Sequence, residues 1–404
     1  MWFKKRRLYM DFAAATPLAP EVRKEMQRGF DAYANPSSPH QEARIAKDLL
    51  EEARTRTARA LGVKPATITF TGSGTESNNL AVYGVVEALL KRGAKPEELH
   101  IIASGFEHPS LGDPISYWAR RGVAISLVAP NEEGIITPDA VAALIRPETV
   151  LVSIVAVQSE IGQIQPLREI AQSLEEVRRK RAQTAQQYAP EALFPILHSD
   201  ASQSLLFVDL SPQHLQVDIA TYDAQKLMGP KGVGVLYKHS RVPMDPLLRG
   251  GKQERGLRAG TENVAGALGV ARATEEAVRH RVKNVARATT VQHYFISLLE
   301  KELPQITING GMKHRIANNI NISVPGADGD YLAVLLDKAG VAVAARSACI
   351  ASGTPSKTVA QLGKGEALAR GTIRFSFTPT VTKDDARRAV NALKTALDVI
   401  DLPS

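Results

Sequence analysis

The sequence predicts an α/β fold in which helices cover both faces of a mostly parallel sheet, followed by a smaller α+β domain. Two observations lead to this prediction. Between residues 66 and 240, short runs of β-branched and other apolar residues recur, and amphipathic helical patterns separate several of them. Buried strands that alternate with helices are typical of parallel sheets covered on both faces. After residue 262 the pattern changes to long helical segments with few strands, which indicates the second domain.

Seven short apolar runs predict the strands of the larger sheet. In chain order they are "ATITF" (66–70), "HIIASG" (100–105), "AISLVA" (124–129), "TVLVSIVAV" (149–157), "FPILHSD" (194–200), "VDIATYDAQ" (217–225) and "GVGVLY" (232–237). Apolar residues at helical spacing predict helices over 76–93, 138–145 and 166–183. Because ligands of such sheets bind at the carboxyl ends of the strands, we expect functional residues just after each run.

The second part of the chain begins with a long periodic stretch at 261–303, which predicts a helix. Strand-like runs follow at 318–326 and 371–377, and helical patterns at 328–340 and 383–400. We therefore predict a large domain over 18–263. The smaller domain would comprise 1–17 and 264–404.

Composition limits the class of protein. The 404 residues are 44% apolar and 23% charged, as in ordinary globular proteins. The formal charge of +8 comes from scattered basic residues without interleaved aromatic side chains, so we expect no stable nucleic-acid binding. One basic cluster, "RRKR" (178–181), is expected on a solvated helix face. No run approaches the ~20 apolar residues of a membrane span, so no membrane partner is expected.

Cys349 is the only cysteine, which excludes an intramolecular disulfide and favours a reducing compartment. The N-terminus has a basic cluster but no continuous apolar segment after it, so we predict no secretory signal. The expected location is the cytoplasm.

Four predicted strand ends carry residues suited to one cofactor. They are the glycine-rich "TGSGTESNN" (71–79), His108, Asp200 in "HSDASQS" (198–204) and Lys226. Taken singly, each has an ordinary alternative: a tight turn, a structural histidine, a helix cap and a surface charge. At one edge of one sheet they form a set that pyridoxal 5′-phosphate requires. This set is a phosphate cradle at a helix N-terminus, a group that stacks on the ring, an acidic partner for the pyridinium nitrogen and a Schiff-base lysine.

The chain resembles the NifS/IscS-like cysteine desulfurases, in the class V group of fold-type I pyridoxal-phosphate enzymes. The resemblance covers nearly the whole length and rests on motifs in the family's order. Besides 71–79 and 198–204, they are "YMDFAAATP" (9–17), "NPSSPH" (35–40), "FEHPS" (106–110), "SEIGQIQP" (159–166), "QKLMGPKGVGVLY" (225–237), "GGKQERGLRAGTEN" (250–263), "RSAC" (346–349) and "TIRFSF" (372–377).

The resemblance implies a role for each matching cofactor residue. Lys226 would be the Schiff-base lysine, Asp200 would contact the pyridinium nitrogen, and Gln203 the ring hydroxyl. His108 would stack on the ring and shuttle protons. Gly74 and Thr75 would bind the phosphate. Thr261 would reach the phosphate of the other subunit, which implies a homodimer.

The resemblance also implies how substrate is handled. Arg374 would bind the carboxylate of L-cysteine, a role that suits the planar guanidinium. Cys349, on a loop over about 346–358, would be the nucleophile that takes the sulfur as a persulfide and leaves L-alanine. The polar, glycine-containing loop sequence does not favour the alternative of an inert buried thiol. Arg346 is a candidate for lowering the pKa of this thiol.

The implied activity is cysteine desulfurase, with sulfur passing to iron–sulfur cluster assembly or to tRNA thiolation. A scaffold or other sulfur-acceptor protein is then a possible partner. The alternatives are another class V activity, such as selenocysteine lyase or a transaminase-like reaction, and a non-catalytic sulfur-transfer scaffold. Cys349 argues against a plain transaminase. No metal ligand set is predicted.

Three departures from the family pattern stand out. Asp223 and Gln225 occupy the places of a serine and a histidine that help to hold the phosphate. Gln225 retains a donor, but an ionised Asp223 would repel a phosphate by about 4 kcal/mol at ~4 Å and an effective dielectric near 20. We expect Asp223 to bind a neighbouring donor, either a backbone N–H or a basic side chain.

The other two departures concern substrate and partner. Ser159 stands where an asparagine would contact the substrate carboxylate, which bears on amino-acid specificity. The sequence also stops soon after its last helical pattern, without the longer tail by which some relatives dock a scaffold.

Overall fold

The structure is a computed structural model that describes residues 7–184, 194–203, 205–346 and 353–400. Its largest sheet contains all seven predicted strands, in the order β2-β8-β7-β6-β5-β3-β4. Neighbouring strands are parallel except that β8 is antiparallel to both β2 and β7. The predicted fold class is therefore confirmed. The strands are β2 (Ile68–Thr71), β3 (His100–Ser104), β4 (Ala124–Val128), β5 (Thr149–Ser153), β6 (Ile196–Asp200), β7 (Ile219–Asp223) and β8 (Gly234–Lys238).

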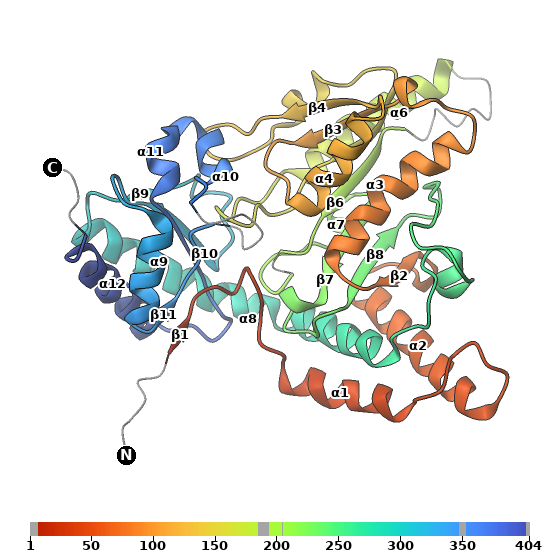
Figure 1. The fold of residues 1–404 in the computed structure, drawn as a ribbon, viewed down its shortest axis with the longest axis horizontal. Helices are drawn as coiled ribbons and strands as arrows, with labels where there is room; N and C mark the ends of the chain where they lie inside the picture. Colours follow the sequence, from red (N-terminus) through yellow and green to blue (C-terminus); the bar gives the residue numbers. More distant parts are fainter. Residues whose placement is uncertain (1–6, 185–193, 204, 347–352, 401–404) are drawn as a thin grey trace.

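Helices pack on both faces of this sheet because successive strand residues point to opposite sides. On β3, Ile101 and Ala103 join a core with α3 and α4, whereas Ile102 joins a separate core with α2, α6 and the first half of α8. Figure 1 shows α3 and α4 in front of the strands. The helices named so far, with the other helices of this part, are α1 (Pro20–Asp31), α2 (Gln41–Ala60), α3 (Gly74–Leu90), α4 (Pro109–Ala119), α5 (Pro138–Ala142), α6 (Leu167–Thr184), α7 (Pro212–Leu215) and α8 (Val264–Glu302).

A second, smaller core lies beside the large sheet, where the two ends of the described chain meet (Figure 1). It is built on a three-stranded antiparallel sheet of order β12-β10-β9 and on the parallel pair β1-β11. Its elements are β1 (Leu8–Tyr9), β9 (Thr307–Ile308), β10 (Asn319–Ser323), α9 (Gly329–Lys338), β11 (Val341–Ala342), β12 (Thr372–Ser376) and α12 (Lys383–Leu397). Two short helices nearby in sequence, α10 (Lys357–Val359) and α11 (Gly365–Arg370), instead form a small separate cluster with Ile161. The segment after β1 therefore leads from the small core to the large one.

Helix α8 belongs to both cores. Its residues up to Ala288 pack in the core of the large sheet, and those from Val291 onward pack in the small core. The division into domains at residues 17/18 and 263/264 stays a prediction.

Two sequence interpretations differ from the structure. The run at 149–157 gives a strand only as far as Ser153, and Ile154–Val157 continue as buried chain that reaches the functional pocket. Arg178 of the "RRKR" cluster is buried rather than solvated: its guanidinium donates to the carbonyl of Pro195 and pairs with Asp218. A basic residue in a charged run can thus lie inside the protein when a buried carboxylate pairs with it.

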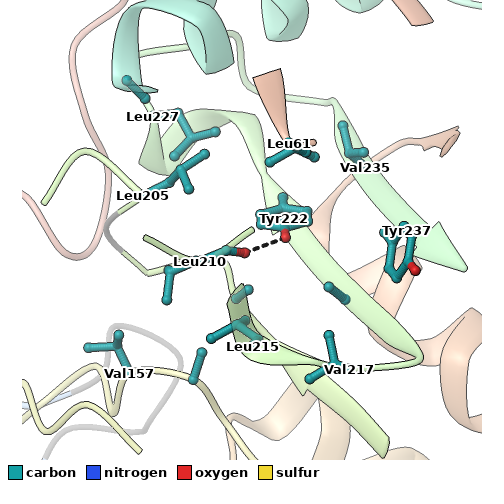
Figure 2. Packing of buried hydrophobic residues seen from close by; sticks show 14 of the residues in the cluster. Leu61, Val157, Leu205, Leu210, Leu215, Val217, Tyr222, Leu227, Val235 and Tyr237 are labelled. Carbon is teal, nitrogen blue, oxygen red and sulfur yellow. Dashed lines mark hydrogen bonds between the residues drawn. The ribbon is translucent and has the colours of Figure 1, made fainter. Parts of the chain in front are cut away.

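Tyr222, on β7, is almost fully buried, and its hydroxyl donates to the carbonyl of Leu210 at 2.6 Å (Figure 2). Tyr222→Phe should lower the free energy of unfolding by about 1–2 kcal/mol, because the buried carbonyl loses its donor while the ring still packs. Chemical denaturation would measure this loss. Tyr237→Phe is the matched control, since no partner for the Tyr237 hydroxyl is found in the described chain. Equal losses for the two variants would contradict the assignment.

Candidate active site

The N-terminus of α3 forms one wall of a pocket at the carboxyl edge of the large sheet. Ser73 caps this helix by accepting from the N–H of Glu76 at 3.1 Å. The hydroxyl of Ser202, a residue only 8% exposed, faces the same place and has no hydrogen-bond partner among the described residues. A Cβ at Gly74 would lie 3.2 Å from this hydroxyl. Backbone donors, a helix dipole and an unpaired hydroxyl together suit a bound anion.

Lys226 lies in the short 3₁₀ turn η4 (Ala224–Lys226) that follows β7. Its amine donates to the carbonyls of Ala13 at 2.5 Å and Ala14 at 2.6 Å. Burial lowers the pKa of Lys226, and the charge of Arg374 acts in the same direction. The lysine is thus a buried amine and not a surface charge.

Asp200 and His108 are connected by hydrogen bonds through Asn78 and Ser110. One oxygen of Asp200 accepts from the amide of Asn78 at 2.8 Å, and the other accepts from the N–H of Ser202 at 2.9 Å. His108 caps α4, and its Nδ1 lies 2.8 Å from the hydroxyl of Ser110, which in turn accepts from Asn78. Burial lowers the pKa of His108, so the ring favours its neutral form.

Asp223 binds neighbouring donors, as expected from the sequence. Its carboxylate accepts from the backbone N–H of Gln225 at 3.2 Å and from that residue's side-chain amide at 3.1 Å. The donors are amides, and no basic side chain hydrogen-bonds to Asp223 in the described chain. Burial raises the pKa of Asp223 above its usual value, although these hydrogen bonds and the charge of Lys226 oppose the shift.

Arg374, on β12, is buried at the border of the pocket. Its guanidinium pairs with Asp11 at 2.7 Å and donates to the carbonyl of Ser159 at 3.0 Å. Its Nε has no partner among the described residues. Two fixed contacts therefore orient a guanidinium that keeps a free donor.

The pocket brings together most of the predicted site residues. Those that line it are Gly74, Thr75, His108, Ser159, Asp200, Gln203, Asp223 and Lys226. Gln225 and Arg374 do not line it but bind Asp223 and Ser159, which do. Thr261 is exposed and lies outside the pocket of its own chain. Cys349 lies outside the described residues.

Sequence reasoning missed several residues of the site. Four residues within the quoted motifs received no role: Asp11, Asn78, Ser110 and Ser202. Asn78 was detectable, because it lies one helical turn after Gly74 and so on the same side of α3. The contacts of Lys226 are with backbone carbonyls and leave no sequence signal.

A second pocket adjoins the first and shares Phe106, His108, Gln158 and Ser159 with it. Thr354, Lys357 and Thr358, from the end of the predicted cysteine loop, line this second pocket. At the two ends of the undescribed segment 347–352, Arg346 and the N–H of Gly353 both donate to Asp330 at 2.7 Å. Arg346 is thus paired with Asp330, and its effect on the thiol pKa of Cys349 stays a prediction.

Comparisons with known proteins agree with this geometry. Residues 8–388 match the family model described as aminotransferase class-V. The chain belongs to this family. It is 36% identical to "Cysteine desulfurase IscS" of Dictyoglomus turgidum, over 98% of this chain and 95% of that protein. Among solved structures, a NifS-like protein superposes with a TM-score of 0.86 at 30% identity, over 98% of this chain and all of that one. SspA, solved in complex with cysteine, superposes with a TM-score of 0.75 at 29% identity, over 93% and 100%.

Class-V aminotransferases use pyridoxal 5′-phosphate, and the pocket fits this cofactor. It offers a buried amine, a buried carboxylate, an imidazole and an anion-binding helix start whose Ser202 hydroxyl has no partner in the described chain. In the part of the chain that the structure describes, no cluster of three or more His, Cys, Asp or Glu side chains is arranged to hold a metal ion. None of the described helices is both long and apolar enough to cross a bilayer.

Glu107 lies beside His108 and is a half-buried acid that lines the second pocket. One of its oxygens accepts from the hydroxyl of Ser104 and from the N–H of Val155, and the other has no partner among the described residues. Burial raises the pKa of Glu107 to about 8. The carboxyl is therefore neutral in the folded protein at pH 7.

Glu107→Gln should change how stability depends on pH. Between the ordinary pKa of 4.5 and the folded-state pKa of about 8, the unfolded chain releases this proton while the folded chain keeps it. The wild type should therefore lose stability relative to Glu107→Gln over this interval, by roughly 1.4 kcal/mol per pH unit, and the difference should then stay constant. Denaturation from pH 5 to 9 measures it. The exposed Glu132→Gln should follow the wild type, and a pH-independent difference for Glu107→Gln would contradict the prediction.

Proposed function

We propose that the protein is a pyridoxal-phosphate-dependent cysteine desulfurase. It converts L-cysteine to L-alanine and carries the sulfur as a persulfide on Cys349. The observation that carries the proposal is that Lys226, Asp200 and His108 converge in one pocket with an anion-binding helix start. A chain that is 36% identical over nearly its whole length to a cysteine desulfurase supports the choice of reaction.

Each cofactor residue has a role that its surroundings support. Lys226 would bind the cofactor covalently, and burial, which lowers its pKa, favours the uncharged amine that could move the Cα proton of the substrate. Asp200, fixed by Asn78, would face the pyridinium nitrogen, Gln203 would reach the ring hydroxyl, and His108 would cover the ring. When bound, the cofactor supplies an electron sink for the substrate carbanion.

The substrate is held and attacked by residues of the small core and its loop. Arg374 binds the carboxylate of L-cysteine with the guanidinium edge that Asp11 and Ser159 leave free. The Cys349 thiolate attacks the substrate sulfur. The S–S bond forms as the C–S bond breaks, the electron pair of the C–S bond stays with the carbon skeleton, and a proton added at this carbon completes alanine.

The finer assignments extend this proposal. The enzyme acts as a homodimer in which Thr261 completes the phosphate site of the other subunit, and its exposure on the single chain suits such a contact. It works in the cytoplasm and passes sulfur to an acceptor protein for iron–sulfur clusters or to tRNA thiolation.

The decisive experiment is a spectrum of the purified protein before and after addition of L-cysteine, with assays of alanine and of persulfide on Cys349. We expect a yellow protein whose spectrum changes, with alanine and persulfide formed in equal first-turnover amounts. Cys349→Ala should keep the spectral change but lose the persulfide. Lys226→Ala should lose the covalent cofactor. A yellow protein that ignores cysteine but acts on selenocysteine would replace the proposed reaction with the lyase, and a colourless protein that cannot be loaded would refute both.

Asp11→Asn tests how Arg374 is positioned. Loss of the ion pair frees the guanidinium to turn, so the KM for L-cysteine should rise about tenfold, with a smaller change in kcat. Steady-state kinetics measure the split. Asp337→Asn is the matched control, because it breaks an exposed ion pair with Arg7, and neither of these two residues lines the pocket. If kcat fell and KM held, Asp11 would act on the chemical step instead.

A further inference from the structure

Asp223 stands at the same helix start as the unpaired Ser202 hydroxyl. A Cβ at Gly74 would lie 3.2 Å from Asp223 Oδ2 as well as from Ser202 Oγ, so the two side chains flank one small space. The carboxylate of Asp223 also accepts from the backbone N–H of Gly74. An acidic side chain therefore already uses a donor that a bound anion would need.

The proposed function puts the phosphate of pyridoxal 5′-phosphate in this space. Helix α3 is 17 residues long, and its first two residues, Gly74 and Thr75, line the pocket. The hydroxyl of Ser202 is the free donor on the opposite side. A phosphate dianion held by these groups would contact Asp223, and two acceptors without a proton between them repel each other.

Other charged groups near Asp223 do not relieve this conflict. Lys226, from the same turn, is committed to the carbonyls of Ala13 and Ala14 and to the covalent bond with the cofactor. Asp200 adds further negative charge from β6, and His108, from the start of α4, favours its neutral form. Gln225 already donates to Asp223. Among the groups of the described chain around Asp223, this leaves a proton as the means of pairing the two acids.

We propose that the cofactor phosphate is bound through a proton that it shares with Asp223, so that this enzyme takes up one proton per cofactor bound and loses cofactor affinity as the pH rises. The inference rests on the proposed function. The geometry supports it through the common approach of Asp223 and Ser202 to the helix start. Burial raises the pKa of Asp223, which acts in the same direction by favouring the protonated carboxyl.

The sign of the effect follows from the proton count. Below its pKa, Asp223 is neutral and donates to the phosphate. Above it, binding must draw a proton from solution, so affinity falls about tenfold per pH unit. Asparagine and serine at position 223 offer a neutral donor at every pH and should remove this dependence.

The test uses 4′-deoxypyridoxine 5′-phosphate, which lacks the aldehyde and so removes the bond to Lys226 from the pH profile. Calorimetric titration in two buffers of different ionisation enthalpy gives both affinity and proton uptake. From pH 7 to 9 the wild type should lose more affinity than Asp223→Asn or Asp223→Ser, approaching about tenfold per pH unit above the pKa of Asp223, and should take up more protons on binding than they do. Asp139→Asn, an exposed carboxylate on α5, should follow the wild type.

Two controls separate the possible failures. With 4-deoxypyridoxine, which carries no phosphate, the wild type and the position-223 variants should show the same pH profile. Equal profiles and equal proton uptake with the phosphorylated probe would overturn the shared proton and leave the proposed function intact. Absence of binding to every variant would overturn the proposed function, and the inference with it. Thermal unfolding of each variant confirms that it is folded.

Discussion

The chain between Asp11 and Thr16 is the element on which the geometry of the pocket depends. It leaves the small core and is bound by residues of both cores. Asp11 pairs with Arg374 of the small core, and the carbonyls of Ala13 and Ala14 accept from Lys226 of the large one. Gln203 also donates to Ala13, and Thr16 binds the carbonyl of Gln225. One short segment therefore fixes the position of the Lys226 amine relative to the Arg374 guanidinium. The two groups are in place before substrate binds, so binding energy is not needed to bring them together.

Burial gives the polar groups of the pocket their chemical character. It lowers the pKa of Lys226 and of His108 and raises those of Asp223 and Glu107. All four shifts favour neutral forms. A pocket with several neutral, hydrogen-bonded groups can move protons near pH 7, whereas the same groups in water would be mostly charged. Under the shared-proton proposal, the same burial would help Asp223 to keep a proton beside the phosphate.

The sheet was predictable from the sequence because its strands are continuous apolar runs, and each of the seven strands overlaps one of the predicted runs, although the ends differ by a few residues. Helices α1, α2 and α4 were not predicted. The buried positions of α2 are mostly alanines, which give little apolar contrast, and Pro114 within α4 argues against a helix. Strand ends located Lys226, Asp200 and His108. The hydrogen bonds from Lys226 to Ala13 and Ala14 join residues more than 200 positions apart. Their acceptors are backbone oxygens, which any residue type supplies, so no pattern in the sequence indicated them.

Helix α8 connects the two cores as one continuous helix. Its contribution changes from one core to the other between Ala288 and Val291, within a single turn. An α-helix turns by about 100° and rises by 1.5 Å with each residue. One residue inserted or deleted in this turn would leave each core with its own side chains but would rotate one against the other. The number of residues in this turn of α8 is therefore as constrained as their identity. Substitutions that keep the helix can be accepted there, whereas insertions and deletions cannot.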